Sequence, residues 1–278
     1  MKQKFKALCA VGALLFAGNV SAASDVFSPN ENKHFTLKMV PFSDVKNAKD
    51  VASFPPEKPR LEDESKYSAS EEEVRVFEWD FKNENCTAKN PDGSFQKVLG
   101  NRVAPVEGIS YLYSVGCSLQ DAINAFYSKG ASAFYCVLPN GTIIQLGNPD
   151  TDVAYSFGKS HWNGNTSLNE NFIGIMLITP SIAGDNDSEE VRKIFNEPAQ
   201  FQGNDWKWYG YPEAQAEAAG KLGNALQYKY GISSRNVTAS YEVTSGRLPG
   251  PGPRFSFKKM FDEFNVGFFP KSQQIDLS

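Results

Sequence analysis

Residues 132–146, Ser-Ala-Phe-Tyr-Cys-Val-Leu-Pro-Asn-Gly-Thr-Ile-Ile-Gln-Leu, form the stretch of sequence that is most informative about the fold. Two runs rich in apolar, aromatic and β-branched residues flank the dipeptide Asn140-Gly141. An Asn-Gly pair between apolar runs is a strong signal for a tight β-hairpin turn. We therefore predict a strand over residues 132–138 and its partner over residues 142–146.

Further strands and helices are predicted on both sides of this hairpin. The predicted strands are residues 74–79, 109–115, 171–178 and 236–240. The predicted helices are residues 119–129, 212–230 and 255–264. Ser118 suits the N-cap of the first helix, and Gly130 and Gly231 suit the ends of the first and second. This order predicts an α/β fold with a mixed central β-sheet flanked by helices.

The first 22 residues are typical of a signal peptide. Lys2, Lys4 and Lys6 precede a short apolar run over residues 7–18, and Val20-Ser21-Ala22 resembles a cleavage site. The apolar run is shorter than the about 20 residues that span a bilayer, and no later stretch qualifies. We therefore expect a periplasmic or secreted protein without a membrane span.

The remaining chain divides into three parts. Residues 23–73 carry several prolines and a charged run, so we expect an extended or partly disordered segment, although its apolar residues could also strap onto the domain. Residues 74–268 are expected to form the domain, with residues 185–208 as an insertion. Residues 269–278 are expected to form a tail.

Composition limits the chemistry of this chain. Its 278 residues suffice for one large domain or two small ones. The formal net charge of −4 argues against a nucleic-acid groove. With only two histidines in the whole sequence, a metal site with three histidine ligands cannot be built.

Three cysteines would remain after cleavage of the signal peptide, namely Cys86, Cys117 and Cys136. An exported protein can form disulfides, and three cysteines allow three alternative pairings. Cys86 and Cys117 both occur in loop-like sequence, which favours their pairing. Cys136 lies in a predicted apolar strand and is expected to be a buried thiol.

Several motifs have the order and spacing found in one enzyme family. Residues 132–146 are similar to "S-A-H-Y…D-G-x-I-x-Q-L", and residues 168–175 to "L-N-D-x-S-I-G-I-E". Residues 211–215 resemble "Y-P/T-x-x-Q", and residues 236–240 resemble "N-V-V-G-H". Residues 75–265 thus resemble the zinc-dependent N-acetylmuramoyl-L-alanine amidases, which include the AmpD-like amidases and the peptidoglycan recognition proteins.

The resemblance implies a specific chemistry. In the family, two histidines and one carboxylate hold Zn²⁺ and leave a fourth position for water. The metal activates that water, a glutamate acts as general base, and the bond between N-acetylmuramic acid and L-alanine is cleaved.

In this chain, every position that the resemblance assigns to this chemistry is substituted. Arg247 and residues 251–253 resemble a further family motif, "G-R-K-x-D-P-G-P". The two histidine ligands, the acidic ligand, the general base and the lysine of that motif fall in turn at Leu112, Ser240, Gly250, Met176 and Leu248. Leucine, glycine and methionine offer Zn²⁺ no ligand of adequate affinity. We therefore predict no zinc, no other cofactor and no catalytic residues, so that the protein would be a pseudoenzyme.

The resemblance also implies which residues border the family's groove. These candidate ligand-binding residues are Tyr113, Tyr155, His161, Trp162, Asn169 and Arg247. Aromatic rings stack on sugars and arginine pairs with carboxylates, which are the chemical groups of peptidoglycan. The alternatives are core packing for the aromatic residues and a solvated surface for His161 and Arg247.

Three functions are compatible with these observations. The first is a catalytically inactive protein that binds peptidoglycan, muropeptides or an envelope protein that handles them. The second is an interaction or effector module with a closed cleft. The third is an N-acetylmuramoyl-L-alanine amidase with a rebuilt site.

Overall fold

The computed structural model describes residues 34–79, 99–114, 116–180, 182–184, 187–195, 198–200, 206–248 and 250–267. The predicted signal peptide, the predicted tail and Cys86 lie outside these residues.

A seven-stranded sheet with the order β1-β2-β6-β5-β10-β4-β13 forms the centre of the fold. Its strands are β1 (Thr36–Pro41), β2 (Glu73–Glu78), β4 (Gly108–Tyr113), β5 (Tyr135–Val137), β6 (Ile143–Gln145), β10 (Phe172–Leu177) and β13 (Val237–Ala239). The pairing of β5 with β6 is antiparallel, as predicted for a hairpin at Asn140-Gly141, and the other pairs of this sheet are parallel. The mixed sheet confirms the predicted fold class.

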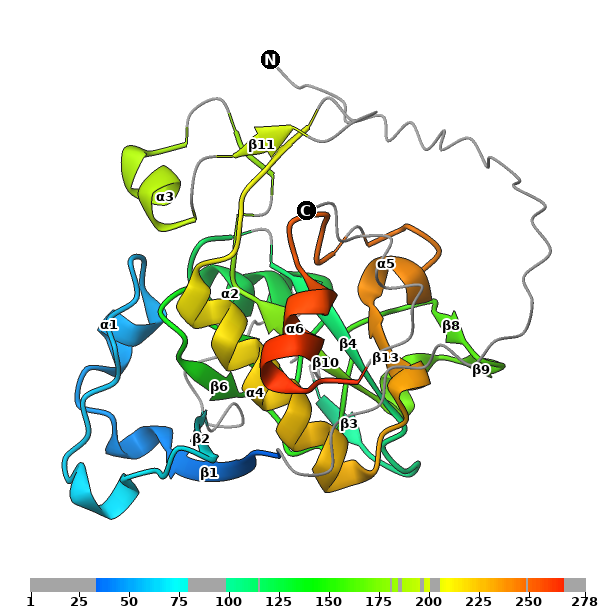
Figure 1. Cartoon of the computed structure of the whole chain (residues 1–278), viewed down its shortest axis with the longest axis horizontal. Helices are drawn as coiled ribbons and strands as arrows, with labels where there is room; N and C mark the ends of the chain where they lie inside the picture. Colours follow the sequence, from blue (N-terminus) through cyan, green and yellow to red (C-terminus); the bar gives the residue numbers. More distant parts are fainter. Residues whose placement is uncertain are drawn as a thin grey trace, which may run out of the picture.

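Helices cover both faces of the sheet. Helices α4 (Glu213–Tyr230) and α6 (Phe257–Phe264) pack on one face, at the front in Figure 1, and α1 (Ala48–Ala52) and α2 (Leu119–Lys129) pack on the other. Successive side chains of a strand point to opposite faces. Tyr111 therefore packs in the core below α4, and Leu112 in the core below α2. The result is a three-layer α/β domain.

Local sequence signals explain where the helices begin and end. The Ser118 hydroxyl accepts a hydrogen bond from the Asp121 amide at 3.0 Å, and the Asp121 carboxylate accepts one from the Ser118 amide at 3.2 Å. This reciprocal capping box starts α2, and Gly130 ends it in the left-handed conformation. Gly231 ends α4 in the same way. These ends agree with the sequence-based prediction.

The N-terminal segment contributes to the sheet from residue 36 onward. Strand β1 is the edge strand and pairs in parallel with β2 along its whole length. The Phe35 amide donates to the Asn224 side chain of α4 at 2.8 Å, which holds β1 against that helix. The sheet therefore begins within the segment that was expected to be extended or partly disordered, and the domain starts before residue 74.

Shorter elements complete the described structure. The short strand pairs are β3 (Leu99–Asn101) with β7 (Asp152–Ala154), β8 (His161–Trp162) with β9 (Asn165–Thr166), and β11 (Ala199–Gln200) with β12 (Lys207–Trp208). The remaining helices are α3 (Glu189–Ile194), α5 (Ser240–Val243) and the 3₁₀ turns Phe42–Asp44, Ser65–Tyr67, Leu168–Glu170 and Ser234–Asn236. The predicted insertion thus contains α3, β11 and β12.

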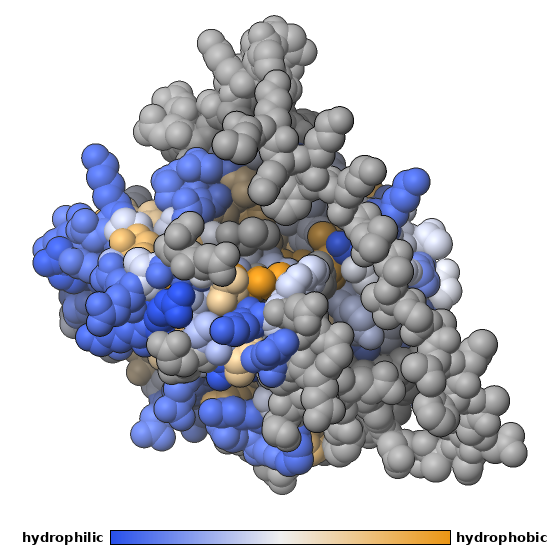
Figure 2. Space-filling model, turned by 90° about the horizontal axis from the view of Figure 1, so that it is seen from above, coloured by the Kyte–Doolittle hydropathy of each residue, from blue (hydrophilic) through white to orange (hydrophobic). Residues whose placement is uncertain are grey.

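The described residues on the face seen in Figure 2 are mostly hydrophilic. On the face seen in Figure 2, hydrophobic residues are visible in a hollow near the middle, between hydrophilic ones. Within the described ranges, no helix combines the length and the apolar character that crossing a membrane requires.

Candidate functional site

A cavity of about 580 Å³ lies between the sheet and helix α2. Leu112 of β4 and Met176 of β10 are direct register partners, and both side chains line the cavity. Ala122 and Phe126 of α2 form the opposite wall. The cavity, which we call the α2 cavity, is therefore lined largely by apolar side chains. Ligand sites of α/β folds commonly occur at the carboxyl ends of parallel strands, where Leu112 and Met176 lie.

The α2 cavity brings together residues that are far apart in the sequence. All the positions that the resemblance assigns to zinc binding and catalysis line it, namely Leu112, Met176, Ser240, Leu248 and Gly250. Ser240 directly follows β13, the neighbour of β4, and begins α5 instead of extending the strand as predicted. The helix starts there because the Glu242 carboxylate accepts a hydrogen bond from the Ala239 amide at 2.9 Å.

The serine hydroxyls of the cavity are hydrogen-bonded to the protein itself. The Ser240 hydroxyl donates to the Gly250 carbonyl at 3.0 Å, and the Ser114 hydroxyl donates to the Gly116 carbonyl at 2.8 Å. The Ser156 hydroxyl donates to the Ser132 carbonyl at 2.8 Å. Serine hydroxyls are not the nitrogen, thiolate or carboxylate ligands of protein zinc sites. The residues at the positions that the resemblance assigns to zinc binding therefore do not fit the ion.

Two further observations concern the same metal. Throughout the described residues, no group of three His, Cys, Asp or Glu side chains is arranged to hold an ion. At Gly250, an added Cβ would lie 2.8 Å from Tyr113 Cδ1, 3.0 Å from the Tyr113 backbone nitrogen and 3.1 Å from Ser240 Oγ. An acidic side chain at position 250 would thus require the β4 backbone to shift.

A comparison with known proteins identifies the family. The family model for N-acetylmuramoyl-L-alanine amidases matches residues 103–253, which is more than half of the chain. This chain belongs to that amidase family. The matched residues include β4, α2, β10, β13 and every position of the α2 cavity named above.

Individual members of the family are more distantly similar. The chain is 30% identical over 105 residues to a putative N-acetylmuramoyl-L-alanine amidase of Rickettsia conorii, covering 38% of this chain and 39% of that protein. It is 27% identical over 128 residues to the N-acetylmuramoyl-L-alanine amidase AmiD of Escherichia coli, covering 46% of this chain and 40% of AmiD. The matches thus span about two fifths of these curated relatives.

Solved structures of the family include a complex of Escherichia coli AmiD with the substrate anhydro-N-acetylmuramic acid-L-Ala-D-gamma-Glu-L-Lys. It is 23% identical to this chain, covers 56% of each chain and has a TM-score of 0.44.

Charged residues of this amidase-family chain lie where α2 borders the cavity. Asp121 and Lys129 both line the cavity and are exposed. The Asp121 carboxylate is engaged in the capping box. Within the described part of the chain, the Lys129 ammonium group makes no ion pair. A ligand in the cavity would therefore find an available cation at its rim.

Cys117 lies at the cavity and is a free cysteine in the structure. The predicted disulfide with Cys86 is therefore not found, and Cys86 itself lies outside the described residues. Burial, and next the negative charges of Asp121 and Asp187, raise the pKa of the Cys117 thiol to about 11. Cys136 is fully buried on β5, as predicted, and burial raises the pKa of its thiol as well.

The raised pKa of Cys117 predicts its reactivity with iodoacetamide. Because only the thiolate reacts, the rate of alkylation should rise about tenfold per pH unit from pH 7 to about pH 10. Mass spectrometry of tryptic peptides measures this rate, and Cys117→Ser serves as the control that assigns the labelled peptide. A rate that levels off below about pH 9 would contradict a pKa raised by burial and neighbouring carboxylates.

The structure brings one of the predicted ligand-binding residues to the α2 cavity, and that residue is Tyr113. Tyr155, His161, Trp162, Asn169 and Arg247 do not line the cavity. Tyr155 and His161 are exposed, and His161 lies in the hairpin formed by β8 and β9.

Three of these residues instead connect loops to one another. The Trp162 indole donates to the Arg235 carbonyl at 2.8 Å. Asn169 Oδ1 accepts a hydrogen bond from the Phe157 amide at 2.8 Å, and the Arg247 guanidinium donates to the Phe157 carbonyl. The family motifs around these positions therefore hold the loops of residues 155–170 in place, in addition to any role in binding.

Sequence reasoning missed the α2 side of the cavity. Leu119 and Ile123 of α2 are buried in the core. The small residues Ala122 and Ala125 line the cavity instead, on the same helix. Alanines on the apolar face of a helix leave space between that helix and the sheet. The alanines of α2 are therefore the sequence signal that could have indicated this wall of the cavity.

Proposed function

We propose that this protein is a non-hydrolysing member of the amidase family that binds peptidoglycan fragments in the α2 cavity. The observation that carries the proposal is the set of side chains at the family's reactive positions. Leu112, Met176, Ser240, Leu248 and Gly250 surround one cavity, and none supplies a zinc ligand or a general base.

The size and chemistry of the cavity support this ligand class. Small-molecule sites typically have volumes of about 300–1,000 Å³, and the α2 cavity has about 580 Å³. Leu112, Met176 and Leu248 suit the methyl groups of the lactyl and L-alanyl units. Lys129 at the rim suits a carboxylate of the stem peptide.

The location follows from the ligand. Peptidoglycan lies outside the cytoplasmic membrane, so we infer that the protein is periplasmic or secreted. The sequence of the first 22 residues, which is typical of a signal peptide, supports the same location. We also propose, as an alternative partner, an envelope protein that handles peptidoglycan.

The alternatives differ in what they require of the cavity. An interaction module with a closed cleft is disfavoured because a volume of about 580 Å³ remains open beside α2. A working amidase would need an activated water and a base. The hydroxyls of Ser114, Ser156 and Ser240 already donate to backbone carbonyls, which disfavours a rebuilt site made from them.

Zinc content and hydrolysis test the catalytic part of the proposal. The purified chain is dialysed against Zn²⁺ and then buffer, and its metal content is measured by elemental analysis. Release of the stem peptide from anhydro-N-acetylmuramic acid-L-Ala-D-gamma-Glu-L-Lys is followed by mass spectrometry. We expect neither stoichiometric zinc nor release. Stoichiometric zinc together with turnover would establish the amidase alternative.

Calorimetric titration with the same muropeptide tests the binding part. The variant Met176→Trp fills the α2 cavity and should raise the dissociation constant by about tenfold or more, which corresponds to about 1.4 kcal/mol. The matched control Gln120→Trp places the same side chain on the exposed side of α2, outside the cavity lining, and should bind like the unmodified chain. Absence of binding by the unmodified chain would refute this function.

A further inference from the structure

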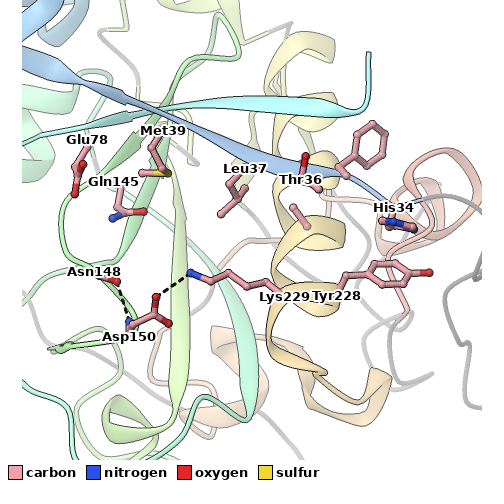
Figure 3. Close-up of a pocket in the computed structure, with 12 residues that line it drawn as sticks. His34, Thr36, Leu37, Met39, Glu78, Gln145, Asn148, Asp150, Tyr228 and Lys229 are labelled. Atoms are coloured by element: carbon pink, nitrogen blue, oxygen red, sulfur yellow. Dashed lines mark hydrogen bonds and ion pairs between the residues drawn. The ribbon is translucent and has the colours of Figure 1, made fainter. Parts of the chain in front are cut away.

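A second cavity, of about 640 Å³, lies along the edge strand β1 (Figure 3). Residues 34–37 and Met39 form one wall. The last turns of α4, with Tyr228 and Lys229, and the loop after β6, with Asn148 and Asp150, form the other. Glu78 lies at one end and His34 at the other (Figure 3). We call this cavity the β1 groove.

The β1 groove and the α2 cavity lie on opposite faces of the sheet. Leu37 and Met39 pack against the core below α4, whereas Leu112 and Met176 pack against the core below α2. Strand β6 is antiparallel to β5, and β5 is parallel to β10. The last residue of β6, Gln145, therefore lies toward the end of the sheet at which β10 begins, not the end at which β10 finishes. A ligand in one cavity therefore does not contact the other.

Gln145 is the feature of the groove that points most directly to a ligand. Its side chain lines the groove between Met39 and Asn148 (Figure 3), and the residue is only 5% exposed. Within the described part of the chain, its amide makes no hydrogen bond. The amide is not among the fully buried side-chain groups without a partner, because it faces the open space of the groove. It can therefore form hydrogen bonds with the hydroxyl or amide groups of a ligand.

Two other polar groups face the same space. The Glu78 carboxylate makes no ion pair or hydrogen bond with the described residues, and its strand position is directly beside Gln145. Asn148 Oδ1 accepts a hydrogen bond from the Asp150 amide at 3.0 Å, which leaves the amide nitrogen of Asn148 for a ligand. Together these planar groups offer both donors and acceptors, as recognition of hydroxyl groups requires.

The charges of the groove argue against an anionic ligand. The Lys229 ammonium is paired with the Asp150 carboxylate at 2.9 Å, and the Tyr230 hydroxyl donates to the same carboxylate at 2.8 Å. The Glu78 carboxylate has no cation beside it in the described residues. A phosphate or a carboxylate would therefore meet repulsion at Glu78 and a neutralised lysine, whereas a neutral polar ligand would not.

Apolar surface lies beside these polar groups. Leu37, Met39 and Ala225 line the groove, and the rings of His34 and Tyr228 lie 4.8 Å apart at one end. A surface that combines aliphatic and aromatic contacts with planar hydrogen-bonding groups fits a sugar, whose rings carry C–H faces and a rim of hydroxyls.

We propose that the β1 groove binds a neutral oligosaccharide. For the source of that saccharide we rely on the proposed function, and assign it to the N-acetylated glycan strand of peptidoglycan. Part of the groove lies outside the region that matches the amidase family. Strand β1 and Glu78 precede residue 103, where the family match begins. The N-terminal strand thus adds a glycan site on the face opposite the α2 cavity.

Titration of the full chain with N,N′,N″-triacetylchitotriose tests this proposal. This probe has no lactyl group or peptide, which are the groups that the side chains of the α2 cavity are proposed to contact. Gln145→Leu should raise the dissociation constant about tenfold, since it removes the amide that faces the groove at similar side-chain size. The milder variant Glu78→Gln should weaken binding less, and its matched control Glu71→Gln, on an exposed turn outside the groove, should not change it.

Three results separate this proposal from the proposed function. Met176→Trp should leave chitotriose binding unchanged while it weakens muropeptide binding. If the unmodified chain binds the muropeptide but not chitotriose, the groove proposal is overturned and the α2 cavity proposal stands. The sugar-free peptide L-Ala-D-gamma-Glu-L-Lys is titrated in the same way. If this peptide binds, if Gln145→Leu abolishes its binding, and if chitotriose does not compete with it, the groove is a peptide site and our assignment is wrong.

Discussion

Replacing Gln215 with leucine is expected to lower the free energy of unfolding by about 2–3 kcal/mol. Gln215 lies in the first turn of α4 and is completely buried. Its side-chain nitrogen donates to the Val137 carbonyl at 2.8 Å and to the Ile178 carbonyl at 2.9 Å. One side chain thereby joins α4 to the ends of β5 and β10.

The magnitude follows from which groups lose their partners. The Val137 carbonyl also accepts a hydrogen bond from the Ile178 amide at 2.9 Å, so it stays paired in the variant. The Ile178 carbonyl would lose its bond to Gln215 in a buried place, which is costly. The side-chain oxygen of Gln215, Oε1, has no partner among the described residues, so its removal offsets part of the loss.

Urea unfolding followed by circular dichroism measures this change. The control Gln120→Leu makes the same substitution at an exposed position of α2 and should change stability by less than about 0.5 kcal/mol. Equal stabilities of the two variants would show that the bonds made by Gln215 contribute nothing to the attachment of α4.

Replacing Gly223 with alanine is expected to destabilise the protein by about 2–3 kcal/mol, although alanine is the better helix former. A Cβ at position 223 of α4 would lie 2.0 Å from the hydroxyl oxygen of Tyr111. That hydroxyl donates to the Ala219 carbonyl at 3.2 Å, and Tyr111 is fully buried between α4 and α6 residues. The tyrosine ring packs against Phe255 and Phe257, so moving it away from a new Cβ would disturb these contacts.

A double-mutant cycle tests this explanation. Tyr111→Phe removes the colliding oxygen, and the next atom of the ring would lie 3.3 Å from the new Cβ. In that background, Gly223→Ala should cost about 2 kcal/mol less than in the unmodified chain. Additive effects of the two substitutions, measured by urea unfolding, would rule out the collision as the cause.

The elements with strong local signals were predictable from the sequence. Asn140-Gly141 identified the hairpin of β5 and β6, and Ser118 with Asp121 and Gly130 defined α2. The motifs of residues 211–215 and 236–240 indicated the amidase family, to which the chain belongs. Edge strand β1 left two interpretations open because its short apolar run lies among prolines, and only its pairing with β2 makes it a strand.

Residue identities and local patterns were sufficient to assign the fold class and the family. They also revealed the substitution of every residue expected to hold zinc or transfer a proton. Which residues share a cavity became visible only in the folded chain. Leu112 and Met176 meet through the parallel register of β4 and β10, and Gly250 reaches them through its hydrogen bond from Ser240. Such contacts depend on how distant strands and helices pack, and no local pattern encodes that packing.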